Sequence, residues 1–339
     1  MKIDIKSMLP EEIDDLTKKM NLPQFRSKQI VNWLSKGIDS FDEMSNIPKD
    51  IRERLSAECE LKNAEIVERF DSKLDETSRF LFSLNDGEYI ESVLMSYNHG
   101  YSLCISTQAG CRMGCKFCAS TVNGLKRNLT TSEMLSQIYE VQKSRNVRVS
   151  NIVLMGMGEP LDNYENVLKF LKLVSNPQGL NIGMRHISLS TCGLVDKIDI
   201  LAEEKLQLTL SVSLHAPSDE IRTKMMPINK KWGVYSLLKA CARYADKTGR
   251  RISFEYAVVD GVNDSDECAV LLSKKLKNML AHINLIPLNN IEKSSLKPSK
   301  NVLRFCETLK KNGINATVRR TLGSDINASC GQLAGKKPK

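Results

Sequence analysis

The sequence of 339 residues predicts an α/β fold: a partial (βα)6 TIM-like barrel, preceded by a small helical domain and a β-hairpin linker. Three observations support this prediction. Beyond residue 100, apolar β-rich runs alternate with helical patterns about six times, which is typical of a parallel sheet with crossover helices. Six such units rather than eight indicate an open barrel. The first 65 residues lack this alternation and carry helical patterns only.

The segment 1–65 is expected to form the helical domain. A first helix begins in "LPEEIDDLTKK", where Pro10 and Glu11 suit the first turn. A second helix follows in "FRSKQIVNWL", and a third begins after Pro48. The basic side chains of this domain would be either solvated or in contact with nucleic acid.

Residues 66–97 are predicted to form a β-hairpin, because two apolar runs flank "NDG" and the pair Asp86-Gly87 is a strong turn signal. Residues 98–324 would form the barrel, and residues 325–339 a C-terminal tail. Active sites of such barrels gather at the carboxyl ends of the strands. The predicted barrel strands are "SLCIST", "NIVLMGM", "HISLST", "LTLSVSLH", "ISFEYAVV" and "HINLIPL".

The composition narrows the possible classes of protein. No apolar run approaches the roughly 20 residues of a membrane-spanning helix, and the first residues lack a secretory pattern. Ten cysteines in such a chain favour metal ligands or catalytic thiols over a disulfide framework. The net charge of +9 favours a polyanionic partner such as nucleic acid, although an uninvolved basic surface fits equally well.

Three cysteines directly follow the first barrel strand. Cys111, Cys115 and Cys118, in "GCRMGCKFCAS", have the spacing C-x3-C-x2-C. Structural zinc takes four ligands, and iron–sulfur clusters are also usually held by four thiolates. Three ligands leave one metal position open, as a catalytic centre requires. The spacing therefore favours a catalytic iron–sulfur cluster, with a zinc knuckle as the alternative.

Polar groups recur at the ends of the later strands, where they could bind a ligand. Gly158 permits a close backbone approach, and Glu159 could pair with an ammonium group. Any one of these residues could equally be an ordinary cap or turn residue, but their recurrence at one rim argues for a site. The others are Ser190, Ser213, Leu214, His215 and Asn289.

A single thiol, Cys330, lies in the tail segment "DINASCGQL". It could be a small apolar residue or a reactive group that moves with the tail. Gly331 would make such a movement easier.

These motifs together resemble one family. The cysteine spacing is similar to the signature of the radical S-adenosylmethionine (SAM) superfamily, and "GMGEP" to its motif for the methionine amino group. Nearly the whole sequence resembles the RlmN/Cfr family of radical SAM RNA methyltransferases. The stretches that carry this resemblance include "LCISTQAGCRMGCKFCAST", "RHISLSTCG", "SLHAP", "NLIPLN" and "DINASCGQL".

The resemblance implies a cofactor and a reaction. One [4Fe–4S] cluster would be held by the three cysteines, with SAM on the open iron and two SAM molecules used per turnover. The product would be C2-methyladenine at adenine 2503 of 23S rRNA and adenine 37 of tRNA. The rim residues Gly158 to Asn289 named above would bind SAM.

The resemblance also assigns three catalytic residues. Cys330 would carry the methyl group as S-methylcysteine, Glu91 would accept the C2 proton, and Cys104 would release the product through a transient disulfide with Cys330. From the residues alone, Cys104 is a buried core thiol and Glu91 an exposed strand carboxylate. Ser329 stands where the family usually has alanine.

The remaining expectations concern partners and alternatives. The resemblance implies a cytoplasmic monomer without membrane contact, reduced by a donor such as flavodoxin or ferredoxin. The basic stretches "GLKRN", "NKKW" and "VRRT" would contact RNA phosphates. The rival activity is C8 methylation of the same rRNA adenine, as in the Cfr type that confers antibiotic resistance. A further alternative is a non-catalytic RNA-binding protein with a structural metal.

Overall fold

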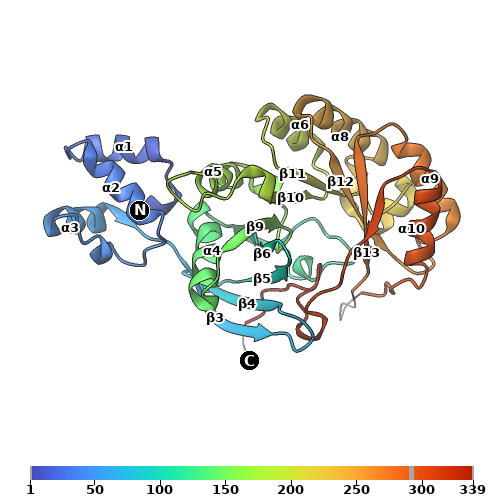
Figure 1. The fold of residues 1–339 in the computed structure, drawn as a ribbon, viewed down its shortest axis with the longest axis horizontal. Helices are drawn as coiled ribbons and strands as arrows, with labels where there is room; N and C mark the ends of the chain where they lie inside the picture. Colours follow the sequence, from blue (N-terminus) through green and yellow to red (C-terminus); the bar gives the residue numbers. More distant parts are fainter. Residues whose placement is uncertain (1, 290–293, 338–339) are drawn as a thin grey trace.

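A ten-stranded mixed sheet runs through the computed structural model, which describes residues 2–289 and 294–337 (Figure 1). The strand order is β14-β13-β12-β11-β10-β9-β6-β5-β4-β3. From β6 to β14 neighbouring strands are parallel, and from β3 to β6 they are antiparallel. The predicted α/β fold is therefore confirmed, and the sheet extends beyond the barrel on one side.

Six connections join the parallel strands, and the described part of each contains a main helix, as the alternation in the sequence predicts. In the fourth connection a short helix, α7 (Asp219–Met225), comes before the longer one. The strands are β6 (Gly100–Cys104), β9 (Val149–Leu154), β10 (Ile187–Thr191), β11 (Thr209–Ser213), β12 (Ile252–Val258), β13 (Ala281–Pro287) and β14 (Ala316–Val318). The helices are α4 (Thr131–Arg145), α5 (Tyr164–Val174), α6 (Val195–Glu203), α8 (Val234–Thr248), α9 (Asp266–Leu276) and α10 (Val302–Lys311).

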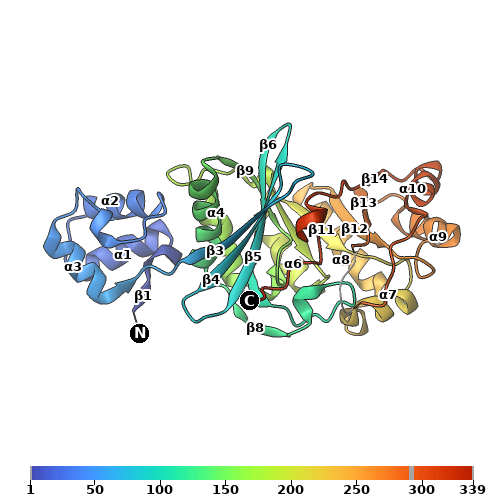
Figure 2. The same cartoon turned by 90° about the horizontal axis from the view of Figure 1, so that it is seen from below.

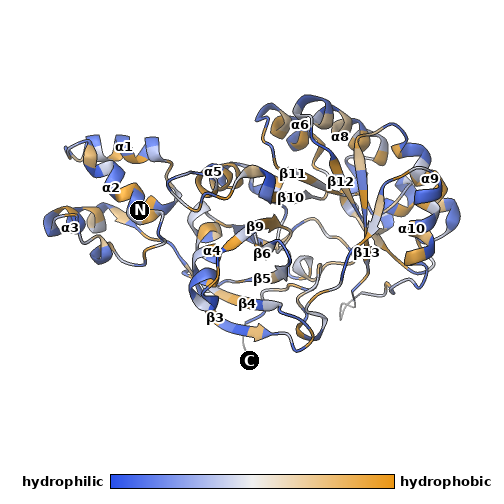
Figure 3. Ribbon diagram, viewed as in Figure 1, coloured by the Kyte–Doolittle hydropathy of each residue, from blue (hydrophilic) through white to orange (hydrophobic). Residues whose placement is uncertain are grey.

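The two faces of the parallel sheet differ in chemistry. The outward-facing side chains, such as Leu189, Val212 and Phe254, are aliphatic or aromatic and fully buried. The outer helices carry both hydrophobic and hydrophilic residues, as amphipathic helices do (Figure 3). The alternate positions, which face the inside of the barrel, are small and polar. They include Ser188, Ser190, Ser211, Ser213 and Ser253.

The sheet curls enough to bring its distant parts together. The Arg319 side chain, just after β14, lies 3.6 Å from the Met155 sulfur, just after β9. Because small residues line the inner face, this curvature leaves space inside the barrel. The cavities described below occupy that space.

The predicted hairpin is present and joins the core sheet. Strands β4 (Ser78–Leu84) and β5 (Tyr89–Tyr97) pair around a turn that contains Gly87 with φ of 82°. A third strand, β3 (Ala64–Asp71), pairs with β4, and β5 pairs with β6. The segment predicted as a linker thus continues the core sheet, because the edge of β6 offers free backbone groups for pairing.

The N-terminal helices form a domain with its own core, which lies at one end of the molecule (Figure 2). Helices α1 (Pro10–Lys19), α2 (Phe25–Leu34) and α3 (Lys49–Glu58) pack around residues such as Leu16, Ile30 and Leu55, and the two-residue strands β1 (Ile3–Asp4) and β2 (Cys59–Glu60) pair beside them. Asp4 accepts a hydrogen bond of 2.6 Å from Ser132 at the start of α4, and Lys169 on α5 pairs with Glu12 at 2.6 Å. These contacts fix the domain against the barrel.

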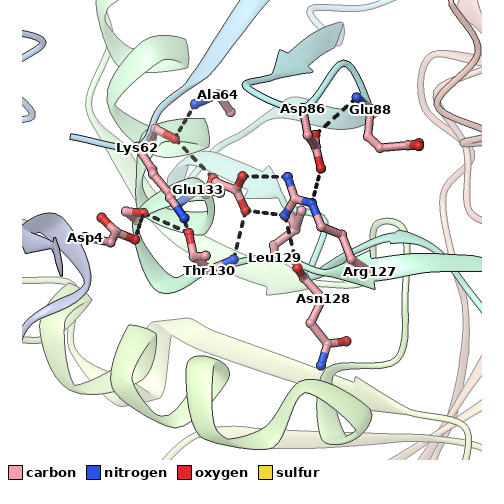
Figure 4. Close-up of polar contacts among 12 residues, drawn as sticks. Asp4, Lys62, Ala64, Asp86, Glu88, Arg127, Asn128, Leu129, Thr130 and Glu133 are labelled. Carbon is pink, nitrogen blue, oxygen red and sulfur yellow. Dashed lines mark hydrogen bonds and ion pairs between the residues drawn. The ribbon is translucent and has the colours of Figure 1, made fainter. Parts of the chain in front are cut away.

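One arginine joins three parts of the core (Figure 4). Arg127, on β8 (Leu125–Asn128), donates two hydrogen bonds of 2.8 Å to Glu133 on α4 and pairs with Asp86 in the hairpin turn. This pairing lowers the pKa of Asp86 and raises that of Arg127. Arg127 therefore has a structural role, and the contact of "GLKRN" with phosphates stays a prediction.

None of the helices in the described residues is long and apolar enough to cross a membrane.

Candidate active site

The three cysteines of the C-x3-C-x2-C motif line one cavity at the carboxyl ends of the parallel strands. This upper cavity has a volume of about 150 Å³ and is lined by Cys111, Cys115 and Cys118 together with strand-end residues. The loop is held by backbone hydrogen bonds, from Cys118 N to Cys115 O at 3.2 Å and from Cys111 N to Gly124 O at 3.1 Å. The loop therefore presents all three thiols to the same space.

The donor set of this cavity fits a polynuclear cluster. In the described part of the chain, no three Cys, His, Asp or Glu side chains are grouped closely enough to hold a single metal ion. A [4Fe–4S] cluster spreads its thiolate ligands over separate iron atoms, so its cysteines surround a wider space. Burial raises the pKa of Cys111 to about 12 and also raises that of Cys115 and Cys118, so binding to metal would be needed to form the thiolates.

Glu159 brings a buried carboxylate to the same cavity. It is only 3% exposed, and burial raises its pKa. Its two oxygens accept backbone hydrogen bonds from Leu161 at 3.1 Å and from Cys192 at 2.7 Å. No ion pair to it exists among the described residues, which leaves the carboxylate able to receive an ammonium group. Gly158 has φ of 106°, and a Cβ there would lie 2.6 Å from the Gln108 Cβ.

His215 lies at the end of β11 in a fixed orientation. Its Nδ1 accepts a hydrogen bond of 2.8 Å from the Ala257 backbone, so the proton is on Nε2. Burial lowers the pKa of His215 to about 3, and nearby Arg222 acts in the same direction. The ring packs edge-on against Phe117 in the cysteine loop, with centroids 4.6 Å apart. His215 is thus a neutral hydrogen-bond donor at the cavity wall.

The other predicted rim residues are mostly brought together. Ser190, Ser213 and Asn289 line the upper cavity with His215. Leu214 does not line it: its side chain is fully buried, and its backbone N–H donates to Glu255 O at 3.1 Å. Only the backbone of Leu214 therefore contributes to the local geometry.

Sequence reasoning missed Arg222, which holds the rim in place. Its side chain is 0% exposed, and its guanidinium donates to the carbonyls of Cys192, Ser213 and Leu214 at 2.7, 2.9 and 3.0 Å. A buried cation is stable here because each of these acceptors compensates its desolvation. An arginine in the exposed-looking segment "SDEIRTK" gives no sequence signal for this role.

Cys330 and Cys104 share a second, smaller cavity. This middle cavity of about 50 Å³ is lined by both thiols, and Cys330 also lines the upper cavity. All ten cysteines are free, so the bridge between these two is absent. Burial raises the pKa of Cys104 to about 12, and the nearby Cys330 sulfur adds to this effect. The structure thus places the tail thiol between the cysteine loop and Cys104.

The tail segment around Cys330 is attached to the cysteine loop. The backbone N–H of Ala119 donates to Gly331 O at 2.7 Å, and the Ser120 hydroxyl donates to Leu333 O at 2.7 Å. The Asn289 side chain donates to Cys330 O at 3.0 Å. The tail therefore has a defined path across the upper cavity.

Glu91 lies outside the upper and middle cavities. It is 4% exposed on β5, two residues before Val93, which lines the middle cavity. Burial raises its pKa, while Arg79 at 3.4 Å and the backbone of the tail at Gly335 oppose this effect. The expectation of an exposed strand carboxylate from the residues alone is wrong, because the tail covers this part of β5.

Arg319 is a second residue that the sequence did not single out. It lines both cavities and pairs with Glu255 on β12 at 3.6 Å. The Cys330 sulfur and the Glu255 carboxylate raise its pKa. A basic residue in "VRRT" was expected on an RNA-contacting surface, whereas this one lies inside the barrel.

Known proteins resemble the chain over almost its whole length. Residues 105–271 match the model of the radical SAM superfamily, and residues 3–61 match that of the ribosomal RNA large subunit methyltransferase N-terminal domain. The chain is 51% identical to a probable dual-specificity RNA methyltransferase RlmN from Lachnoclostridium phytofermentans, over 98% of this chain and 94% of the relative. It is 53% identical to the protein of the same description from Clostridium novyi, over 95% of each.

A solved structure agrees with this relationship. A radical SAM methyltransferase from Sphaerobacter thermophilus superimposes with a TM-score of 0.93 at 39% identity, over 98% of this chain and 100% of that structure. The motifs, the fold and these relatives lead to one conclusion: the chain belongs to the RlmN family of radical SAM dual-specificity RNA methyltransferases.

Proposed function

We propose that this enzyme methylates C2 of adenine 2503 in 23S rRNA and of adenine 37 in tRNA, through an S-methylcysteine at Cys330. One observation carries the proposal: Cys330 lies where the cavity of the three cysteines meets the cavity of Cys104. A thiol in this position can receive a methyl group on one side and be attacked by a second thiol on the other.

The residues of the upper cavity fit the cofactor and SAM. Cys111, Cys115 and Cys118 would hold a [4Fe–4S] cluster and leave one iron free for the methionine end of SAM. Glu159 would receive the amino group. A cluster bound there would supply the electron that cleaves SAM to methionine and a 5′-deoxyadenosyl radical. Gly158, Ser190, Ser213, His215 and Asn289 would position the rest of SAM, with Leu214 acting through its backbone.

Cys330 would act as the methyl carrier. Adenine C2 is electron-poor and cannot displace the methyl group of SAM directly, whereas a thiolate can. The methyl on sulfur would then lose a hydrogen atom to the radical and add to C2 as a methylene. Arg319 lines both the upper and the middle cavity, as Cys330 does. Its guanidinium would keep a positive charge next to the Cys330 sulfur.

Two residues would complete the transfer. Glu91 would accept the C2 proton, and its raised pKa suits a general base that must also release the proton again. The backbone of the tail at Ala334 and Gly335 now lies against this carboxylate. The radical adduct would also give up one electron, which a cluster bound in the upper cavity could take back. The Cys104 thiolate would then attack the Cys330 sulfur, so that a disulfide forms, the bond from sulfur to the methylene carbon breaks, and that carbon takes up a proton to become the methyl group. The tail covers Glu91, so the tail would have to move before the substrate adenine could reach this carboxylate.

The proposed partners follow from this reaction. The enzyme would act as a cytoplasmic monomer on 23S rRNA and tRNA, with one-electron reduction by a flavodoxin or a ferredoxin. The net charge of +9 supports an RNA substrate through phosphate attraction.

An anaerobic assay with SAM, a reductant and a 23S rRNA fragment tests the proposal, with the nucleosides read by mass spectrometry. We expect 2-methyladenosine from the wild-type enzyme and none from Cys330→Ala, which should keep its iron because Cys330 is not one of the three ligands. Formation of 8-methyladenosine would select the sister activity. A colourless zinc protein without SAM cleavage would select the non-catalytic alternative.

A further inference from the structure

A third cavity lies inside the barrel at the opposite ends of the strands. This lower cavity is lined by Ser102, Asn151 and Ser188, which stand near the starts of β6, β9 and β10. Its volume is about 230 Å³, and it opens to the surface between the exposed side chains of His99, Arg185 and His186. Arg319 is the one residue of its described lining to which the proposed reaction gives a part, and the rest of the cavity has no role in that reaction.

The three cavities form one series along the barrel. Met95, Tyr97, Val153 and Arg319 line both the lower and the middle cavity. The middle cavity in turn shares Cys330 with the upper one. A group that enters the lower cavity therefore approaches Cys330 from the side opposite to the cysteine loop.

The two ends of this series differ in their charged lining. The upper cavity has two carboxylates, Glu159 and Glu255, besides Arg319, which lines all three cavities. These carboxylates suit the ammonium and sulfonium groups of SAM. The lower cavity is lined by basic residues, and no aspartate or glutamate belongs to its described lining. Such an end attracts phosphodiester groups. Its basic or titratable residues are His99, Arg185, His186 and Arg319.

Aromatic and amide groups at this end suit a nucleobase. The rings of Tyr97 and His99 are stacked, with centroids 5.2 Å apart and planes 10° apart. Asn151 Oδ1 is hydrogen-bonded to His186 Nδ1 at 3.0 Å, whereas Asn151 Nδ2 is buried and has no partner among the described residues. Buried donors in folded proteins are nearly always paired, so this amide is available to a ligand acceptor.

We propose that the lower cavity is the port through which RNA presents its adenine to Cys330. In this arrangement SAM occupies the upper cavity and the unstacked target nucleotide enters from below. Tyr97 and His99 stack on a base at the mouth, Arg185 contacts a phosphate, and the Asn151 amide donates to a base nitrogen. This inference rests on the proposed function, since it requires that RNA be the substrate.

A variant that blocks the lower cavity tests this inference separately from the proposed function. Ser188→Phe should fill the lower cavity, with Ser188→Ala as its matched control. Two readouts are needed. S-methylcysteine at Cys330, formed with SAM in the absence of RNA, reports folding and SAM binding. Methyladenosine in an RNA fragment reports access of the base. We expect Ser188→Phe to form S-methylcysteine and to methylate RNA at least tenfold more slowly than Ser188→Ala.

Two further variants measure binding directly by fluorescence anisotropy with a labelled single-stranded adenine-containing RNA. Tyr97→Ala should bind about tenfold more weakly, whereas Tyr97→Phe, which keeps the ring, should bind like the wild type. Arg185→Ala should weaken binding and reduce the salt dependence by about one phosphate contact, whereas Lys310→Ala, on the outer surface of α10, should not.

The outcomes are distinct. If Ser188→Phe methylates RNA as fast as Ser188→Ala, the port is wrong even though the proposed function holds. If the wild type makes no methyladenosine, the proposed function fails, and the binding of Tyr97→Ala and Arg185→Ala still decides whether RNA uses the lower cavity. The same binding data decide the question if Ser188→Phe does not fold. Unchanged binding in both would overturn the inference.

Discussion

The side-chain amide of Asn289 donates a 3.0 Å hydrogen bond to the backbone carbonyl of Cys330. A residue at the end of a barrel strand thus holds the tail segment that carries Cys330. Both residues line the upper and the middle cavity. The proposed SAM-binding role of Asn289 and the position of the methyl carrier are therefore coupled, since one amide group serves both.

Replacement of Asn289 should loosen the tail. Asn289→Ala removes a hydrogen bond worth about 1 kcal/mol, so the backbone around residues 329–333 should exchange its amide hydrogens about fivefold faster. Hydrogen–deuterium exchange without SAM measures this effect. Ser294→Ala is a suitable control, because its hydroxyl donates to Lys116 O on the same side of the barrel without touching the tail. Equal exchange in both variants would mean that the Asn289 contact does not order the tail.

Removal of Cys104 should trap the enzyme on its substrate. In Cys104→Ala the methylene joined to C2 can still form, but no thiol attacks the Cys330 sulfur. We expect a covalent RNA–protein adduct that survives denaturation and is visible as a shifted band on a denaturing gel. Cys268→Ala, a half-buried cysteine on α9 outside the cavities, should turn over without an adduct. Multiple turnovers by Cys104→Ala would show that another group releases the product.

His215 should make the folded state less stable in mild acid. Its pKa is about 3 in the folded protein and about 6.5 when unfolded, so below pH 6.5 only the unfolded chain takes up the proton. Its contribution to the free energy of unfolding is complete above pH 6.5 and falls by about 1.4 kcal/mol between pH 7.5 and pH 5.5.

Urea unfolding at the two pH values measures this change. His215→Asn keeps an acceptor for the Ala257 N–H but cannot titrate, so its stability should fall less over the same interval. His282→Asn is a control at a half-buried histidine, whose pKa is lowered by burial to a smaller extent. The same pH dependence in His215→Asn and the wild type would show that His215 is not buried as a neutral ring.

Loss of Arg127 should destabilise the core. Arg127→Leu leaves the buried Glu133 carboxylate without its cation and frees the hairpin turn at Asp86. Because the Arg127 side chain is 30% exposed, the cost should be below that of a fully buried pair, at about 2 kcal/mol. Thermal unfolding followed by circular dichroism measures it. Lys126→Leu, the exposed neighbour, should unfold at the wild-type temperature, and an equal loss in both variants would contradict the structural role.

The elements of the barrel could be predicted because their signals are local. The alternation of apolar runs and helical patterns gave six βα units, and glycine and serine motifs at strand ends gave the rim. Ser190, Ser213, His215 and Asn289 meet at one cavity because parallel strands all end at the same edge. The serines at alternate positions of β10 and β11 are a further local signal, since small polar residues on the inward face of the strands indicate a hollow barrel.

The features that could not be predicted from the sequence depend on contacts between segments that are distant along the chain. The pairing of β5 with β6 turned a predicted linker into part of the sheet, and the tail buried a glutamate that its strand alone would expose. Arg127 and Arg319 look like surface charges in the sequence. Their acidic partners, Glu133 and Glu255, come from other elements, so only the folded structure shows that these charges are neutralised inside the core.

The hydrogen bond from Ser120 to Leu333 joins residues that are 213 positions apart. During synthesis on the ribosome, the cysteine loop emerges long before its partner in the tail, and the barrel between them can fold first. The segment that carries Cys330 is then among the last parts of the candidate site to be put in place. Under the proposed function, synthesis would have to pass residue 333 before the cysteine loop and the proposed methyl carrier could meet in one site.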